Sequence, residues 1–160
     1  MLTFAGNHAV SLDEKDRVVL PLLLRKCINE PDRESLLKDM FMVRPSDTNN
    51  CLELYPKVEY DKAIDDLESS YLPSDKKGQD YLRFFTSRVE PVDLDRQYRF
   101  TIPAASKAAA SLGKKLIFVG RTKMIEIWDE ATWAVWEASR GKSMEKPEPS
   151  EPSRRMQAAG

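Results

Sequence analysis

The stretches LDEKDRVVLPLLLRK, residues 12–26, and LDRQYRFTIPAASKA, residues 94–108, are two copies of one pattern. Both copies contain an aspartate, an arginine, a proline and a second basic residue in the same order. The number of residues between counterparts is the same for all four pairs. The matching pairs are Asp13 and Asp95, Arg17 and Arg99, Pro21 and Pro103, and Arg25 and Lys107. Spaced matches of this kind indicate an internal duplication.

A second repeated block follows each copy. LELYPKVEY, residues 52–60, resembles IEIWDEATW, residues 125–133. The two copies of this second block are separated by fewer residues than the two copies of the first block. The first half therefore has additional residues between its first and second blocks. The polar stretches at 29–38 and 47–50 are the natural places for this insertion, because surface loops accept extra length at small entropic cost.

Both halves have the same expected local structure. Residues 17–20 and 99–102 are β-branched or aromatic runs that end at a proline, which indicates short strands. Pro21 and Pro103 then suit the first turn of a short helix, where the missing N–H group is not needed. Further strands are expected at 40–43, 52–55, 116–119 and 125–128, and helices at 56–72 and directly after Asp129.

Each half is too small to bury a robust core alone, at about 60 to 70 residues. The expected halves are 1–72 and 80–141, joined by a linker at 73–79. The economical arrangement pairs them about a pseudo-twofold axis around one core, as a single α+β domain of two pseudo-symmetric β-α halves. Residues 142–160 are rich in proline and poor in large apolar side chains, which is typical of a disordered tail.

Composition excludes several classes of protein. The 160 residues carry 25 basic and 26 acidic side chains, a net charge of −1. This excludes a broadly basic protein that coats nucleic acid, but it allows a local basic patch. No apolar stretch approaches the roughly 18 residues of a membrane span, and we expect no secretory leader. Two cysteines make no disulfide framework, so a reducing cytoplasm is the expected compartment.

The residues give little support to enzymatic chemistry. His8, Cys27 and Cys51 lack the spacing of zinc ligands, and a base–nucleophile pair of His8 with Cys27 has no supporting pattern. The glycines form no phosphate-binding loop. Neighbouring carboxylates such as Asp65 and Asp66 fit a solvated helix face. We therefore expect no enzyme, metal, cofactor or small-molecule substrate.

The doubled motif resembles the MraZ family from Phe4 to about Trp136. In the first half the likeness rests on FxG, on LDxKxR followed by a spaced proline and arginine, and on CLxLYP. In the second half it rests on residues 83–85, LDxQxR, IP and EIWD with a later tryptophan. The resemblance implies an AbrB-like swapped-hairpin barrel with short helices outside it.

The resemblance also implies a function. MraZ proteins are bacterial DNA-binding regulators of the division and cell-wall gene cluster, including their own promoter. They assemble into rings, and each subunit presents Asp-x-x-Gly-Arg turns to double-stranded DNA. The expectation for this chain is a cytoplasmic, nucleoid-associated homo-oligomer that binds promoter repeats sequence-specifically and has no membrane partner.

The corresponding turns are residues 13–17 and 95–99, and both lack the family's glycine. Asp16 and Tyr98 stand in its place. A glycine in a tight turn marks positive φ, which costs a residue with a side chain on the order of 1 kcal/mol. Aspartate tolerates that conformation fairly well and tyrosine poorly. Either the turns are reshaped, or packing against neighbouring surface offsets the strain.

Arg17 and Arg99 are the expected direct contacts to DNA, because an arginine fork can bind guanine O6 and N7. Lys15 and Arg96 suit contacts to phosphate, which position a protein without reading sequence. The net charge is only +1 for residues 13–26 and +2 for residues 95–107. A single subunit is therefore a weak binder, and several copies along one promoter would raise the effective concentration.

Two alternatives stay open on the sequence alone. Each arginine could pair with the aspartate of its own turn, Asp13 or Asp95, and simply close the turn. The chain could instead be an oligomeric interaction scaffold with reduced or lost DNA binding, because both glycines are missing and Asp16 places a negative charge beside Arg17.

Overall fold

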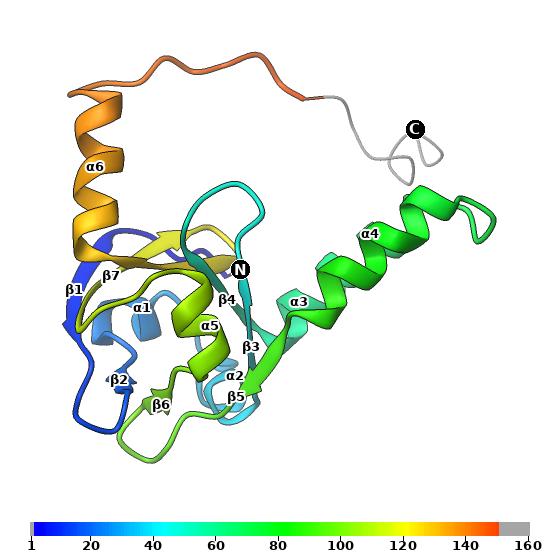
Figure 1. Cartoon of the computed structure of the whole chain (residues 1–160). Coiled ribbons are helices and arrows are strands. Elements are labelled where there is room, and N and C mark those ends of the chain that lie inside the picture. Colours follow the sequence, from blue (N-terminus) through cyan, green and yellow to red (C-terminus); the bar gives the residue numbers. More distant parts are fainter. Residues whose placement is uncertain (1, 151–160) are drawn as a thin grey trace.

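The computed structural model describes residues 2–150, which form eight strands and six helices (Figure 1). The strands are β1 (Asn7–Ser11), β2 (Arg17–Val19), β3 (Phe41–Pro45), β4 (Leu52–Pro56), β5 (Glu90–Val92), β6 (Arg99–Thr101), β7 (Lys115–Arg121) and β8 (Met124–Asp129). The helices are α1 (Leu22–Lys26), α2 (Arg33–Lys38), α3 (Lys57–Ser69), α4 (Lys76–Ser87), α5 (Ala104–Ala109) and α6 (Glu130–Arg140).

The strands form one antiparallel sheet and one separate ribbon. The sheet has six strands in the order β1-β7-β8-β4-β3-β5, and β2 pairs with β6 in the two-stranded ribbon. Short helices cover these strands, so the fold is α+β, and this prediction is confirmed. Because β1 and β5 lie at the two edges of the sheet, its closure into a barrel stays a prediction.

A pseudo-twofold axis relates the two halves. In the ribbon, Val18 lies opposite Phe100, its counterpart in the first repeated block. In the sheet, Glu53 lies opposite Glu126, its counterpart in the second repeated block. Each repeated block therefore pairs with its own copy, and the sheet order is symmetric, with β1 equivalent to β5, β7 to β3, and β8 to β4.

The halves exchange their first strands across this axis. β1 of the first half pairs with β7 of the second half, from Asn7 opposite Val119 to Ser11 opposite Lys115. In the same way, β5 of the second half pairs with β3 of the first half. Neither half completes a sheet by itself, which is the arrangement that a swapped hairpin requires.

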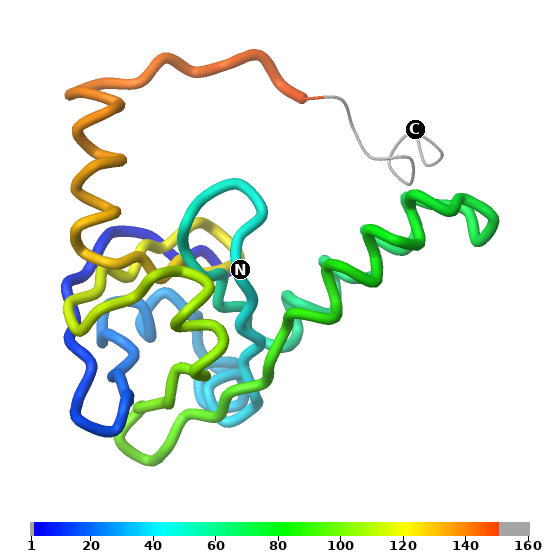
Figure 2. Tube along the Cα trace, viewed as in Figure 1, coloured from blue at the N-terminus to red at the C-terminus, as the bar shows by residue number. Residues whose placement is uncertain are grey.

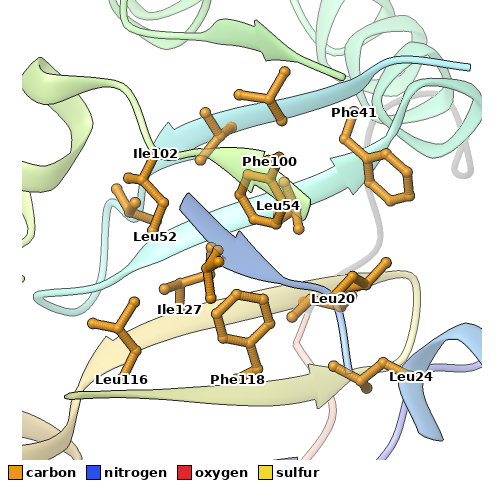
Figure 3. Packing of buried hydrophobic residues seen from close by; sticks show 14 of the residues in the cluster. Leu20, Leu24, Phe41, Leu52, Leu54, Phe100, Ile102, Leu116, Phe118 and Ile127 are labelled. Carbon is orange, nitrogen blue, oxygen red and sulfur yellow. The ribbon is translucent and has the colours of Figure 1, made fainter. Parts of the chain in front are cut away.

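The core lies between the sheet, the ribbon and the short helices (Figure 3). Repeat counterparts contribute to it: Leu20 and Ile102 follow the two ribbon strands, and both are almost completely buried. Phe100 packs against Phe118 with 6.3 Å between ring centroids. Side chains from both halves interleave in one hydrophobic cluster, so burial of either half depends on the presence of the other.

Most predicted strands and helices coincide with observed ones. Pro21 and Pro103 directly precede α1 and α5, and Asp129 caps α6 by accepting a hydrogen bond from the Ala131 amide at 3.0 Å. The short edge strands β1 and β5 were not predicted. Neither was α2, which lies within the polar stretch predicted as an insertion.

Helix α4 was also missed, and it changes the description of the connection between the halves. Residues 73–79 were predicted as a linker, but α4 begins at Lys76, and Asp75 accepts a hydrogen bond from the Gly78 amide at 3.1 Å. The first turn of α4 resembles a linker because its residues are polar or glycine, although Gly78 is already buried against Tyr71. Further along the helix, Phe85 stacks on Tyr60 of α3. Of the predicted tail, residues 142–150 are exposed and irregular, and 151–160 lie outside the described residues.

The two repeated turns point away from the long helices (Figure 2). The turns that connect β1 to β2 and β5 to β6 extend at one end, next to the ribbon. Helix α6 extends from the opposite end, and α3 and α4 project from one side of the molecule, away from the turns. The long helices α3, α4 and α6 therefore do not cover the turns.

We expect Phe100→Ala to lower the free energy of unfolding by about 3–5 kcal/mol, because it leaves a cavity at the centre of the ribbon. The matched control is Val19→Ala on the same ribbon, where the side chain is 44 % exposed and the expected change is under about 0.5 kcal/mol. Urea unfolding followed by tryptophan fluorescence measures both. Equal losses would contradict a core centred on the ribbon.

Candidate nucleic-acid interface

The turn at residues 13–17 is organised by its first aspartate. Asp13 Oδ1 accepts hydrogen bonds from the backbone amides of Lys15 at 2.8 Å and Arg17 at 2.9 Å. Asp13 Oδ2 accepts from Arg17 Nε at 2.7 Å. The Asp13 amide in turn donates to the Arg17 carbonyl at 2.9 Å. One carboxylate therefore satisfies the donors that a tight turn leaves unpaired.

The turn at residues 95–99 repeats this pattern atom for atom. Asp95 Oδ1 accepts from the amides of Gln97 at 2.8 Å and Arg99 at 2.9 Å, and Asp95 Oδ2 accepts from Arg99 Nε at 2.9 Å. The duplication in the sequence is thus a duplication of hydrogen-bond geometry. The aspartate and the arginine of the motif form matching hydrogen bonds in both halves.

These bonds stabilise the ionised form of each aspartate. The backbone hydrogen bond from Arg17 lowers the pKa of Asp13, and the arginine side chain and the Lys15 amide lower it further. The backbone hydrogen bond from Arg99 lowers the pKa of Asp95 in the same way. A carboxylate that accepts several N–H groups stays charged at neutral pH.

Asp16 and Tyr98 keep the conformation that glycine would favour. Their φ angles are 59° and 60°, in the left-handed region. The turns are therefore not reshaped by the loss of glycine. The backbone of each strained residue is held by the opposite half, because the Ile102 amide donates to the Asp16 carbonyl at 3.1 Å and the Leu20 amide donates to the Tyr98 carbonyl at 2.8 Å.

A cation from the opposite half also contacts each strained side chain. Lys107 Nζ donates to Asp16 Oδ1 at 3.0 Å, and the Arg25 guanidinium lies over the Tyr98 ring, 3.9 Å from its centroid. Arg25 on α1 and Lys107 on α5 are repeat counterparts. The same position in each half therefore contacts the turn of the opposite half. Packing against neighbouring surface therefore accompanies the strain, which is the second of the two expected outcomes.

Arg17 and Arg99 lie on the same outward face of the ribbon. Arg17 is opposite Thr101, and Arg99 is opposite Val19. These four residues share a face because side chains alternate along a strand, and the intervening residue of each strand is buried. About a third of each arginine side chain is exposed, 31 % for Arg17 and 29 % for Arg99.

The pairing of each arginine with its own aspartate, which the sequence left as an alternative, is present in both turns. It involves the Nε atom of Arg17 and of Arg99. Within residues 2–150, no hydrogen bond donated by the terminal Nη atoms of either arginine is found. Each arginine can therefore close its turn and still contact a ligand. The aspartate binds Nε and orients the guanidinium, and the two Nη nitrogens stay available as donors.

Lys15 and Arg96 are exposed on the two turns, as their predicted contact to phosphate requires. They are not repeat counterparts, since Lys15 corresponds to Gln97 and Arg96 to Glu14. The sequence presented Arg25 and Lys107 only as landmarks of the repeat. Their contacts across the axis were missed, because a constant spacing along the chain says nothing about which half a side chain touches.

The residues weighed for other chemistry have ordinary structural contacts. His8 Nε2 lies 3.3 Å from the Ala5 carbonyl, and the Cys27 thiol donates to the Leu23 carbonyl at 3.3 Å. Burial is the main cause that raises the pKa of Cys51 to about 12. Across residues 2–150, no three His, Cys, Asp or Glu side chains group as metal ligands, and no helix has the length and apolarity to cross a membrane.

Each half contributes a strand–turn–strand unit, β1 to β2 or β5 to β6, whose strands pair with the other half and whose turn carries an arginine. This arrangement defines a duplicated swapped-hairpin protein. Comparison with known proteins agrees with this class. The family described as "MraZ protein, putative antitoxin-like" matches residues 3–82 and 85–153, one match in each half. The chain belongs to the MraZ family.

Curated relatives lead to the same family. The transcriptional regulator MraZ of Tropheryma whipplei (strain TW08/27) is 35 % identical over 131 residues, which cover 82 % of this chain and 84 % of that protein. The protein of that name from Clavibacter michiganensis subsp. michiganensis (strain NCPPB 382) is 32 % identical, with 81 % and 83 % covered. That from Arthrobacter sp. (strain FB24) is 31 % identical, with 88 % and 91 % covered. The family prediction is confirmed, and with it the prediction that the chain is not an enzyme.

We expect the turns to lose their stabilising effect in acid. Because the pKa of Asp13 and of Asp95 is lowered on folding, each carboxylate stabilises the folded chain above the ordinary pKa of about 4. That stabilisation is lost as pH falls through the lowered pKa. The double variant Asp13→Asn, Asp95→Asn should be less stable than the wild type at pH 7 and should approach it in acid. Urea unfolding across this pH range measures the difference, and parallel pH profiles would contradict the expectation.

Proposed function

We propose that this chain is a transcriptional regulator that binds double-stranded DNA with the end of the molecule that carries the ribbon and its two turns. One observation carries the proposal: Arg17 and Arg99 lie on one outward face, each oriented by its own aspartate through Nε. The relatives, which are named transcriptional regulators, support it.

The proposed contacts follow from the chemistry of these side chains. The major groove is about 12 Å wide and admits a two-stranded β-ribbon. Arg17 and Arg99 would bind guanine edges with their terminal nitrogens, which discriminate between bases. Lys15 and Arg96, exposed on the turns, would bind phosphates and set the register of the protein on DNA.

The proposed targets and assembly belong to the same hypothesis. The chain would act on promoter repeats of the division and cell-wall gene cluster, as a ring-shaped homo-oligomer in the cytoplasm and associated with the nucleoid. Two features support assembly. Apolar side chains are exposed beside the ribbon, with Leu22 at 53 % and Leu23 at 61 %, and α6 has no buried residue. Exposed apolar surface of this kind is typical of protein interfaces.

The domain organisation is proposed on the same grounds. Residues 1–72 and 80–141 would form two halves that fold only together, because their first strands are exchanged and their core is shared. A chain cut between the halves would then regain its structure only when both pieces are present.

The second candidate is an oligomeric scaffold that has reduced or lost DNA binding. The acidic content of the first turn favours it, since Asp13, Glu14 and Asp16 outnumber Lys15 and Arg17. Such a protein would keep the exposed apolar surfaces and lose retention of DNA.

We expect the double variant Arg17→Ala, Arg99→Ala to abolish specific retention of a duplex from the region upstream of its own gene. Each arginine should account for about tenfold or more in affinity. Binding of the wild type should weaken steeply as salt rises, because each phosphate contact releases counterions. A gel shift at several salt concentrations measures both effects.

The matched control is Arg83→Ala, because Arg83 is an exposed arginine on α4, which projects away from the turns (Figure 2), and pairs with nearby Asp80. Its affinity for the duplex should equal that of the wild type. Absence of any wild-type retention at low salt would overturn the proposal and favour the scaffold.

We expect light scattering at micromolar protein to give a mass several times that of a single chain. The physical reason is the apolar surface that one chain leaves exposed. A monomer at that concentration would contradict the ring and, with it, the gain in affinity that several copies on one promoter provide.

A further inference from the structure

We infer that the two turns contribute unequally to DNA binding: the turn at 95–99 is the main contact and Tyr98 is a further DNA-contacting residue, whereas Asp16 weakens the turn at 13–17. This inference rests on the proposed function and deepens it. The two turns differ at residues 14–16 and 96–98, so the difference follows from the sequence of this chain.

The first observation is the charge of the two turns. Residues 13–17 carry three acidic and two basic side chains, a net charge of −1, whereas residues 95–99 carry one acidic and two basic side chains, a net charge of +1. Both turns have the same hydrogen-bond geometry, so charge is the main difference within the turns themselves. A cavity beside the second turn is also lined by Glu30, Arg33, Glu34 and Lys38, whose charges balance. DNA attracts the second turn and repels the first.

The second observation is the state of Asp16. Its ion pair with Lys107 leaves 47 % of the Asp16 side chain exposed, so the negative charge still faces solvent beside Arg17. The pair also holds the Lys107 ammonium, a cation that could otherwise reach a phosphate. Asp16 therefore both adds repulsion and removes one source of attraction.

The third observation is the state of Tyr98. The Arg25 guanidinium covers one face of its ring at 3.9 Å, yet 38 % of the residue stays exposed at the turn that also carries Arg96 and Arg99. Within residues 2–150, no hydrogen bond to its hydroxyl is found. A tyrosine hydroxyl donates readily to phosphate, and its ring can pack against sugar or base.

Strain supports a functional role for Tyr98. A bulky residue at φ 60° costs more than the aspartate at φ 59° in the other turn, and the chain adopts this conformation with an exposed ring held by a cation from the opposite half. Strained residues of this kind gather at functional sites, where the surrounding structure maintains them. In this chain the strain presents an aromatic side chain at the end of the molecule that is proposed to contact DNA.

The test uses the same substitution in both turns. Asp16→Gly and Tyr98→Gly each restore the glycine that the turn conformation favours, so both variants should fold, which thermal unfolding by circular dichroism verifies. The probe is a fluorescein-labelled duplex from the region upstream of its own gene, with a scrambled duplex of equal length as the specificity control. Fluorescence anisotropy with the full chain gives the affinities.

We expect opposite effects from the two variants. Asp16→Gly should raise affinity about three- to tenfold, because it removes a charge that repels phosphate and frees Lys107. Tyr98→Gly should lower affinity for the upstream duplex about three- to tenfold, because it removes a contact worth about one hydrogen bond or one packed aromatic group. Arg99→Ala should weaken binding more than Arg17→Ala.

Equal effects of the two glycine variants, or equal losses from the two arginine variants, would overturn the inference and leave the proposed function intact. Failure of the wild type to bind either duplex at low salt would instead overturn the proposed function. The two failures are therefore distinguishable in one set of measurements.

Discussion

Strand pairing across the pseudo-twofold axis holds the two halves and both turns together. Val18 meets Phe100 in the ribbon and Glu53 meets Glu126 in the sheet, so each repeat is completed by its own copy. A half of this size would bury too little apolar surface to be stable alone. Exchange of β1 and β5 solves this problem, because each half supplies an edge strand to the sheet of the other.

The same pairing maintains the turns at the ribbon end. Asp16 and Tyr98 hold a backbone conformation that their side chains disfavour, and each is held by a backbone amide and a cation from the opposite half. Turn geometry is therefore a property of the paired halves. Arg25 and Lys107 occupy the same repeat position. Lys107 forms an ion pair with Asp16, and Arg25 forms a cation–π contact with Tyr98.

Symmetry also brings like charges together, and the sheet compensates for them. Glu53 and Glu126 lie opposite one another at the axis and are both buried. Arg44 donates to Glu53 at 3.0 Å, and Arg121 approaches both carboxylates, at 3.4 Å to Glu53 and 3.3 Å to Glu126. Arg44 also lies 3.7 Å from the Phe85 ring centroid, so the same cation joins the sheet to α4. Buried charges are tolerated only when paired in this way.

The duplication, the α+β class, most strands and helices, and the positions of both turns could be predicted from the sequence, because each leaves a local pattern of spacing and polarity. The folded structure was needed to show that Arg17 and Arg99 share one face and that Lys107 and Arg25 reach across the axis. It was also needed to show that α4 begins inside the predicted linker and that β1 and β5 are strands. These features depend on contacts between residues distant in the chain, and a local pattern carries no information about which distant surface will satisfy an exposed strand edge or a strained turn.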